Sequence, residues 1–188
     1  MKIILTSIFA VCLGLLGCKT IDSTNASTTV ADAGVSTAAI AQDGILVGKI
    51  KRKDLESEQF GLWFNPKYEE YTVDSTRIDA IKKGLKGVDI TLFMGTWCGD
   101  SKRETPRVYK ILDAADYDSK KVDLIAVTRA KDTPEHYEEG LNITNVPTII
   151  FKKDGKELGR IVEYPIESLE KDMLKILNGE EYKHAYAK

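Results

Sequence analysis

One cysteine stands where a sulfur atom could become chemically reactive. The run Trp97-Cys98-Gly99-Asp100-Ser101 follows the apolar stretch Ile90–Met94, and this order predicts a strand that leads into the first turn of a helix. The N-terminus of a helix presents unpaired N–H groups and about half a positive charge, so it favours a thiolate over a thiol. Because the thiolate is the nucleophilic form of cysteine, we expect Cys98 to attack electrophilic sulfur.

The motif contains no second cysteine. Ser101 carries a hydroxyl where a two-cysteine redox motif would carry its second sulfur. A mixed disulfide formed at Cys98 would therefore have to be released by the thiol of another molecule. Asp100 adds a carboxylate to the first helical turn, where it interacts favourably with the helix dipole but opposes a neighbouring thiolate. These two effects of Asp100 have opposite signs.

The first residues have the pattern of an export signal. Lys2 supplies a positive charge, and Ile3–Gly17 is an apolar run without charge that is shorter than the roughly 20 residues needed to span a bilayer. The run ends in Leu15-Leu16-Gly17-Cys18, which resembles the signal of bacterial lipoproteins. This resemblance implies cleavage after residues 1–17 and acylation of the sulfur and the new amino group of Cys18. A plain secretory signal with an incidental cysteine is the alternative, and it also exports the domain.

The cysteine count makes Cys98 the remaining thiol. Of the three cysteines, Cys12 would leave with the signal and Cys18 would be acylated. An internal disulfide is then impossible, so the core must stabilise the domain alone. Acyl chains stabilise membrane attachment by about 0.8 kcal/mol per buried methylene. We therefore expect a lipoprotein of the bacterial cell envelope, periplasmic or in the outer membrane, anchored by lipid to a membrane outside the cytoplasm.

Length and composition indicate a single folded domain behind a tether. After the ends are discounted, 188 residues are too few for two ordinary domains. Residues 18–44 start at Cys18 and are rich in Ser, Thr and Ala, which predicts a flexible tether, and residues 45–188 form the expected domain. The 27 basic and 29 acidic residues form no basic stripe interleaved with aromatics, so we exclude nucleic acid as a partner.

Strand and helix patterns alternate along the domain. The expected strands are Ile45–Ile50, Val88–Met94 and Val122–Val127, and a hairpin runs from Val146 to about Val162 with its turn at Asp154-Gly155. Four helices are expected. The first starts at Asp74 or Ser75 and ends near Lys86, and the second runs from about Asp100 to Ala115 with Pro106 as an interior kink. The third is short and starts at Thr133, and the fourth runs from Ile166 to Leu177. This order predicts an α/β fold with a mixed sheet.

Two further segments have expected roles in packing. The aromatic segment Phe60–Phe64 is followed by the turn signal Asn65-Pro66, and its side chains with Tyr68 and Tyr71 are expected to pack an N-terminal extension against the sheet. A substrate groove lined by these rings is the alternative. Arg103 and Glu104 are expected to lie on a solvated face of their helix.

These elements together resemble the thioredoxin-like fold. The matching parts are the Trp97–Ser101 motif after an apolar strand, Pro106 five residues beyond Ser101, and Asn145-Val146-Pro147-Thr148 at the start of the hairpin. The resemblance covers roughly Val88 to Leu177. It implies a central mixed β-sheet flanked by helices, here with an N-terminal extension.

The resemblance also implies roles for residues around Cys98. Pro147 would follow a cis peptide bond and lie against Cys98, so that the backbone of Val146 could pair with an extended substrate. Trp97 would cover one side of the sulfur, and Gly99 and Asp100 would start the helix. Leu92 occupies the place where thioredoxins carry a buried acidic residue that assists proton transfer at the second sulfur.

We therefore predict a membrane-anchored thiol–disulfide oxidoreductase that acts through Cys98 alone. Its partners would be protein or small-molecule disulfides and an external thiol reductant, and no cofactor is expected. His136 and His184 are far apart in sequence and show no metal-ligand spacing, so no metal site is expected.

Two other functions fit the same residues. The first is a non-catalytic module that binds client segments in a groove formed by Trp97, Cys98 and Pro147. The second is a peroxide-reducing thiol, which would need a hydroxyl and an arginine near the sulfur, and Thr96, Ser101 and Arg103 are the candidates.

Overall fold

The computed structural model describes residues 39–40 and 43–187. The expected signal peptide, Cys18 and most of the expected tether lie outside these residues. Within the expected tether, β1 (Ala39–Ile40) pairs antiparallel with β2 (Leu46–Ile50), so that Ala39 lies opposite Val47. In the described part of the chain, no helix combines the length and the apolar composition needed to cross a bilayer.

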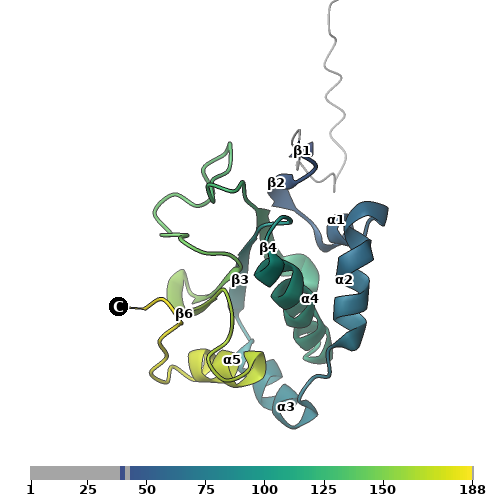
Figure 1. Ribbon diagram of the computed structural model, residues 1–188. Coiled ribbons are helices and arrows are strands. Elements are labelled where there is room, and N and C mark those ends of the chain that lie inside the picture. Colours follow the sequence, from purple (N-terminus) through teal and green to yellow (C-terminus); the bar gives the residue numbers. More distant parts are fainter. Residues whose placement is uncertain (1–38, 41–42, 188) are drawn as a thin grey trace, which may run out of the picture. The chain divides into compact units, whose positions relative to one another are not determined.

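A mixed sheet forms the centre of the domain (Figure 1). In the described part of the chain its strand order is β1-β2-β4-β3-β5-β6. The central strand β3 (Val88–Met94) lies parallel to β4 (Val122–Ala126) and antiparallel to β5 (Thr148–Lys153), which forms a hairpin with β6 (Lys156–Val162). The sheet confirms the predicted strands and the hairpin. It also confirms the thioredoxin-like fold expected from the sequence.

The helices pack against one face of this sheet. They are α1 (Arg52–Leu55), α2 (Glu58–Glu70), α3 (Ser75–Gly84), α4 (Gly99–Ala114) and α5 (Leu169–Leu177). Each contributes buried apolar side chains to one core, together with Ile90, Leu92 and Met94 of β3. In Figure 1, α2 lies beside α4 and α3 beside α5. Burial of alternate β3 residues on this side leaves Phe93 for the opposite face.

An irregular segment covers the opposite face. Phe93, Ile125 and Ile150 form a second buried cluster there, against which Leu141 and Ile143 pack. The segment 127–147 consists of turns and contains no helix, so the predicted short helix at Thr133 is wrong. Thr133 instead uses its hydroxyl to accept a hydrogen bond from the N–H of Tyr137 and to donate one to Glu138, which holds a turn in place of a helix.

Helix α2 continues through the predicted turn at Asn65-Pro66. Pro66 lies inside the helix, which ends at Glu70. An interior proline costs about 3 kcal/mol because it lacks an N–H and clashes with the preceding turn. Phe60, Phe64 and Tyr68 recur at helical spacing, and Phe64 contacts Tyr68 and Tyr109 with ring centroids 6.3 and 6.1 Å apart. The aromatic face is buried, but it packs on α4 and not directly on the sheet as expected, and this burial offsets the cost of the proline.

Two further predicted helix starts, at Asp74 or Ser75 and at Ile166, differ in accuracy. Asp74 caps α3 as expected, since its carboxylate accepts the N–H of Thr76 at 3.1 Å. Helix α5 begins later than Ile166, because the carboxylate of Asp172 accepts the N–H groups of Ile166 and Glu167 and holds them outside the helix.

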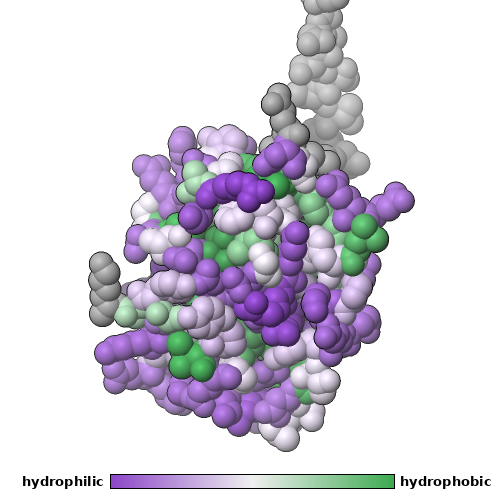
Figure 2. Space-filling view, viewed as in Figure 1, coloured by the Kyte–Doolittle hydropathy of each residue, from purple (hydrophilic) through white to green (hydrophobic). Residues whose placement is uncertain are grey.

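The surface over these elements is mainly hydrophilic in Figure 2, with hydrophobic residues in small separate patches, as expected where most apolar side chains are in the core.

Stability should fall in alkaline solution because of a buried tyrosine on α4. Tyr109 is 1% exposed, and burial raises the pKa of its hydroxyl above the ordinary value near 10, with opposing contributions from Arg52 and Asp113. The unfolded chain therefore loses this proton first. The stabilisation is complete below about pH 10 and is lost as pH rises toward the folded-state pKa.

Urea unfolding between pH 10 and pH 12 checks this prediction. The free energy of unfolding should fall more steeply for the wild type than for Tyr109→Phe, by up to about 1.4 kcal/mol per pH unit for one proton. Tyr164→Phe controls for loss of a hydroxyl from a ring that is 41% exposed. Equal slopes for the wild type and Tyr109→Phe would contradict the prediction.

Candidate active site

Cys98 lies at the junction of β3 and α4. It is the N-cap residue of α4, with an extended backbone, and its thiol makes no capping hydrogen bond. Its N–H donates to the carbonyl of Gly95 at 2.9 Å, and its own carbonyl accepts the N–H of Lys102 at 3.0 Å. The side chain is half-buried and the thiol is free. Cys98 is therefore a partly exposed residue at a helix N-terminus.

The loop before β5 brings Val146 and Pro147 to Cys98. The Val146–Pro147 peptide bond is cis, and Cys98 Sγ donates a hydrogen bond to the carbonyl of Val146 at 3.2 Å. Both residues of the loop are buried. The expected juxtaposition of these three residues, which are far apart in sequence, is therefore present.

Ser101 and Leu92 stand where a dithiol protein would have its second cysteine and its buried acidic residue, and both have structural roles here. Ser101 is fully buried, and its hydroxyl accepts the N–H of Gly95 at 3.1 Å. This bond ties the first turn of α4 to the end of β3. Leu92 is fully buried in the core beneath the helices. Position 101 therefore supplies no second thiol, and position 92 supplies no carboxylate, for chemistry at Cys98.

Trp97, the residue before Cys98, packs with it against the second buried cluster. Its indole Nε1 donates to the carbonyl of Val127 at 3.0 Å. Gly95 is required by this packing, because a Cβ atom there would lie 2.6 Å from the indole ring. The guanidinium of Arg129 lies over the same ring, 5.4 Å from its centroid.

Arg129 is a neighbour of the site that the motif did not indicate. The parallel register aligns Met94 with Ala126, and Trp97 and Arg129 each lie three residues beyond these strand ends. The ends of adjacent parallel strands meet at the same edge of a sheet. Strand register was therefore the signal that could have found Arg129.

The charges next to the motif form a network on α4. Asp100 pairs with Arg103 at 2.6 Å, and Arg103 also pairs with Glu104 at 2.6 Å. Arg107 donates to the same oxygen of Glu104 at 3.3 Å. Glu104 is only 2% exposed, so the prediction of a solvated face is wrong for this residue. Two guanidinium groups pair with Oε1 and partly compensate for burial of the charge, whereas Oε2 is buried without a hydrogen-bond partner.

Other candidates are not brought to the site. Across residues 39–40 and 43–187, no group of three or more His, Cys, Asp or Glu side chains is arranged to hold a metal ion. Arg103, a candidate for peroxide chemistry, is engaged by Asp100 and Glu104. The arrangement offers one accessible sulfur, an indole wall and the polar backbone at Val146. These groups suit the capture of a chain or ligand that carries a disulfide.

Comparison with known proteins identifies one matching family and similar proteins. A family model described as thioredoxin matches residues 63–176. A thioredoxin of Echinococcus granulosus is 33% identical over 88 residues, which cover 45% of this chain and 75% of the relative. A thioredoxin of Chlamydia caviae is 34% identical over 82 residues, which cover 44% and 72% of the two chains.

A solved structure is also similar. The oxidised form of mitochondrial thioredoxin 3 from Saccharomyces cerevisiae is 24% identical, with a TM-score of 0.32, and the match covers 51% of this chain and 86% of that one. The family match spans more than half of the chain and includes β3, Cys98, α4 and the Pro147 hairpin. Because this family model matches more than half of its residues, the chain belongs to the thioredoxin family.

Proposed function

We propose that this thioredoxin-family protein is a membrane-anchored thiol–disulfide oxidoreductase that acts through the single sulfur of Cys98. The observation that carries the proposal is the placement of this half-buried thiol at the first turn of α4, beside Val146 and with Ser101 at the second position. A helix N-terminus stabilises the thiolate that must attack. The absence of sulfur at position 101 restricts the reaction to one protein thiol.

The reaction proceeds by two exchanges. The Cys98 thiolate attacks one sulfur of a substrate disulfide, a new S–S bond forms to Cys98, and the other substrate sulfur leaves as a thiolate. An external thiolate, or the second cysteine of the substrate, then attacks the mixed disulfide and releases Cys98. This sequence suits isomerisation or removal of a small thiol from a protein better than net reduction by the enzyme alone.

The walls of the site support positioning of an extended substrate. The Val146 carbonyl lies 3.2 Å from Sγ, so a segment that pairs with this backbone would bring its disulfide to Cys98. Pro147 has no N–H that could compete for the thiolate. The Trp97 indole, fixed by Val127, supplies an apolar surface beside the reacting sulfurs.

A second function is a binding module without turnover. The observation that favours it is the contact between Cys98 Sγ and the Val146 carbonyl at 3.2 Å, which engages the sulfur with a backbone group of the protein itself. In this function the groove retains clients by contacts alone. Cys98→Ser separates the two functions, because it abolishes covalent capture but leaves such retention unchanged.

The residue at position 101 should decide whether a mixed disulfide persists. When the protein is incubated with an excess of a disulfide-bonded peptide, mass spectrometry should find an adduct on Cys98 in the wild type. Ser101→Cys supplies an internal attacking thiol, so it should lower the amount of adduct by roughly tenfold. Ser101→Ala removes the hydroxyl without adding sulfur and should keep the adduct. The proposal fails if the wild type forms no adduct, or if the Cys and Ala variants behave alike.

The two glycines that flank Trp97 and Cys98 provide a matched pair of variants. Gly95→Ala places a methyl group 2.6 Å from the Trp97 ring, so the indole must move away from Val127. We expect adduct formation at Cys98 to slow by about tenfold, since small displacements of a positioning group have effects of this size. Gly99→Ala adds the same methyl group where nothing lies within 4 Å, and its rate should match the wild type. Equal rates for both variants would exclude a role for Trp97.

Anchoring at Cys18 predicts where the protein is found in the cell. We expect the wild type in the membrane fraction, labelled by a palmitate analogue, because acylation of Cys18 would attach it to lipid. Cys18→Ser should lose the label and leave the membrane fraction. Cys12→Ser is the control, since its sulfur would be removed with the signal. Membrane retention of an unlabelled wild type would show that the anchor is wrong.

A further inference from the structure

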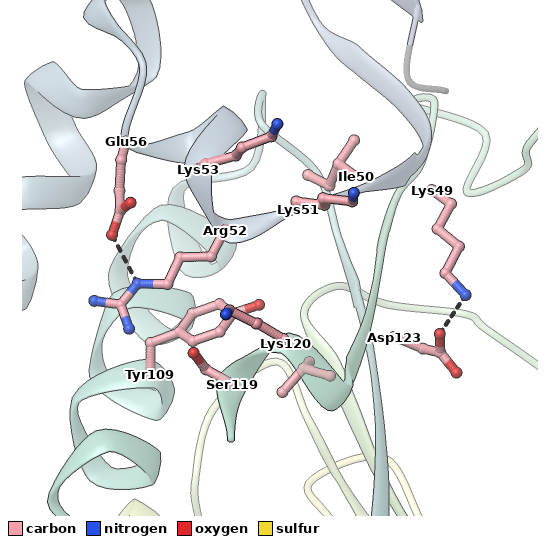
Figure 3. Close-up of a pocket in the computed structure, with 11 residues that line it drawn as sticks. Lys49, Ile50, Lys51, Arg52, Lys53, Glu56, Tyr109, Ser119, Lys120 and Asp123 are labelled. Atoms are coloured by element: carbon pink, nitrogen blue, oxygen red, sulfur yellow. Dashed lines mark hydrogen bonds and ion pairs between the residues drawn. The ribbon is translucent and has the colours of Figure 1, made fainter. Parts of the chain in front are cut away.

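Arg129 differs from every other arginine of the chain, because no carboxylate of the described residues pairs with it. The other arginines pair with carboxylates at nitrogen–oxygen distances between 2.6 and 3.3 Å: Arg52 with Glu56 and Asp113, Arg77 with Asp74, Arg103 with Asp100 and Glu104, Arg107 with Glu104, and Arg160 with Glu157. Figure 3 shows one of these pairs, Arg52 with Glu56. Across residues 39–40 and 43–187, the side chain of Arg129 has neither an ion pair nor a hydrogen bond. Its N–H donors are therefore available to a ligand.

The indole ring of Trp97 positions this guanidinium at the candidate active site. The guanidinium lies over the ring, 5.4 Å from its centroid, and the indole is fixed by its hydrogen bond to the carbonyl of Val127 at 3.0 Å. A guanidinium that lies on a ring face keeps its N–H donors at its edge, where they match the two oxygens of a carboxylate. Since Trp97 precedes Cys98, a carboxylate bound by Arg129 lies beside the motif that carries the sulfur.

Arg129 lies in a turn that several hydrogen bonds close. The N–H of Thr128 donates to the carbonyl of Asp132 at 3.0 Å, and the N–H of Lys131 donates to the carbonyl of Thr128 at 3.0 Å. The hydroxyl of Thr128 accepts the N–H of Ala130 at 3.1 Å and donates to the carboxylate of Asp132. The backbone on both sides of Arg129 is thus held, so a ligand loses less of its binding energy to ordering the protein.

The charge at this position is opposite to that of the protein as a whole. The formal net charge is −2, so long-range electrostatics disfavour an acidic substrate. Arg103, which lies beside the motif on α4, is engaged by Asp100 and Glu104. A preference for acidic substrates would therefore be local, would depend on Arg129 and would weaken with added salt.

Strand order places Arg129 and Val146 on opposite sides of Cys98. Arg129 follows β4 and Val146 precedes β5, and these strands flank β3, which leads to Cys98. Neighbouring strands are about 4.8 Å apart, so the ends of β4 and β5 are separated by about 10 Å. An extended chain covers this distance in about three residues. A segment that pairs with Val146 and passes Cys98 thus brings a residue within about three positions of its own cysteine to Arg129.

We propose that Arg129 binds a carboxylate of the substrate and so selects disulfide-bonded segments with an acidic residue within about three positions of the cysteine. This inference rests on the proposed exchange at Cys98 and adds the class of substrate to it. The guanidinium N–H groups bind the carboxylate oxygens while the backbone of the segment pairs at Val146. These two contacts hold the substrate sulfur at Cys98 and increase the rate of the first exchange.

Matched peptides test this selection. Each peptide carries one cysteine as a disulfide with 2-thiopyridine, and either Glu or Gln two positions before or after that cysteine. The Cys98 thiolate attacks the peptide sulfur, a disulfide between the peptide and Cys98 forms, and pyridine-2-thione leaves and is measured by its absorbance. The full chain carries Cys12→Ser and Cys18→Ser, so that Cys98 is the sulfur that reacts. We expect the Glu peptide to react about fivefold faster than the Gln peptide, which is the size of an exposed ion pair, and the two rates to converge in about 1 M salt.

Variants assign this rate ratio to Arg129. Arg129→Gln should reduce the ratio to about one, and Arg129→Glu should favour a peptide with Lys at the same position over the Gln peptide. Lys131→Gln removes the same charge from the same turn and should keep the wild-type ratio. Peptides with Glu or Gln eight positions from the cysteine should react at equal rates, because that residue is too far along the chain.

Two contrary outcomes have different meanings. Equal rates for the Glu and Gln peptides with the wild type, or a ratio that Lys131→Gln lowers as much as Arg129→Gln does, would overturn selection by Arg129 and leave the exchange at Cys98 standing. If neither peptide forms an adduct with protein that thermal melting shows to be folded, the proposed exchange is wrong and selection by Arg129 fails with it.

Discussion

Burial of β3 on both faces is the constraint on which the rest of the structure depends. Ile90, Leu92 and Met94 pack under the helices, while Phe93 packs under the segment 127–147. A strand covered in this way cannot shift its register without moving apolar side chains out of the core. Its end is therefore fixed, and so is the sulfur of Cys98, which the turn Gly95–Trp97 joins to that end.

The same constraint assembles the surroundings of the sulfur. Strand β5 lies antiparallel to β3, with Phe93 opposite Thr148, so the residues before Thr148 meet the turn that carries Cys98. The cis bond at Pro147 and the Val146 carbonyl occupy this position. On the other side, the parallel strand β4 brings Val127 to the Trp97 indole. The site is thus a product of sheet register more than of any single local motif.

Sequence patterns predicted the parts of the fold that follow from local rules. The apolar strand Val88–Met94, the helix after Cys98 and the Asp154-Gly155 turn each have a local signal, and the structure contains all three. The predictions failed where tertiary packing overrides a local preference. Pro66 stays in a helix because the aromatic face of α2 is buried, and Glu104 is buried between two arginines that lie on its own helix. Neither the burial of α2 nor the register that brings Arg129 to Trp97 is visible to a rule that considers neighbouring residues only.

The central claim is that Cys98 starts an exchange that another molecule must finish. The direct measurement is the release of a preformed mixed disulfide at Cys98, followed at a series of concentrations of an added small thiol. With Ser101 in the second position, the release rate should increase linearly with the thiol concentration and extrapolate to zero without thiol. Release that continues without added thiol, at a rate independent of its concentration, would contradict the account.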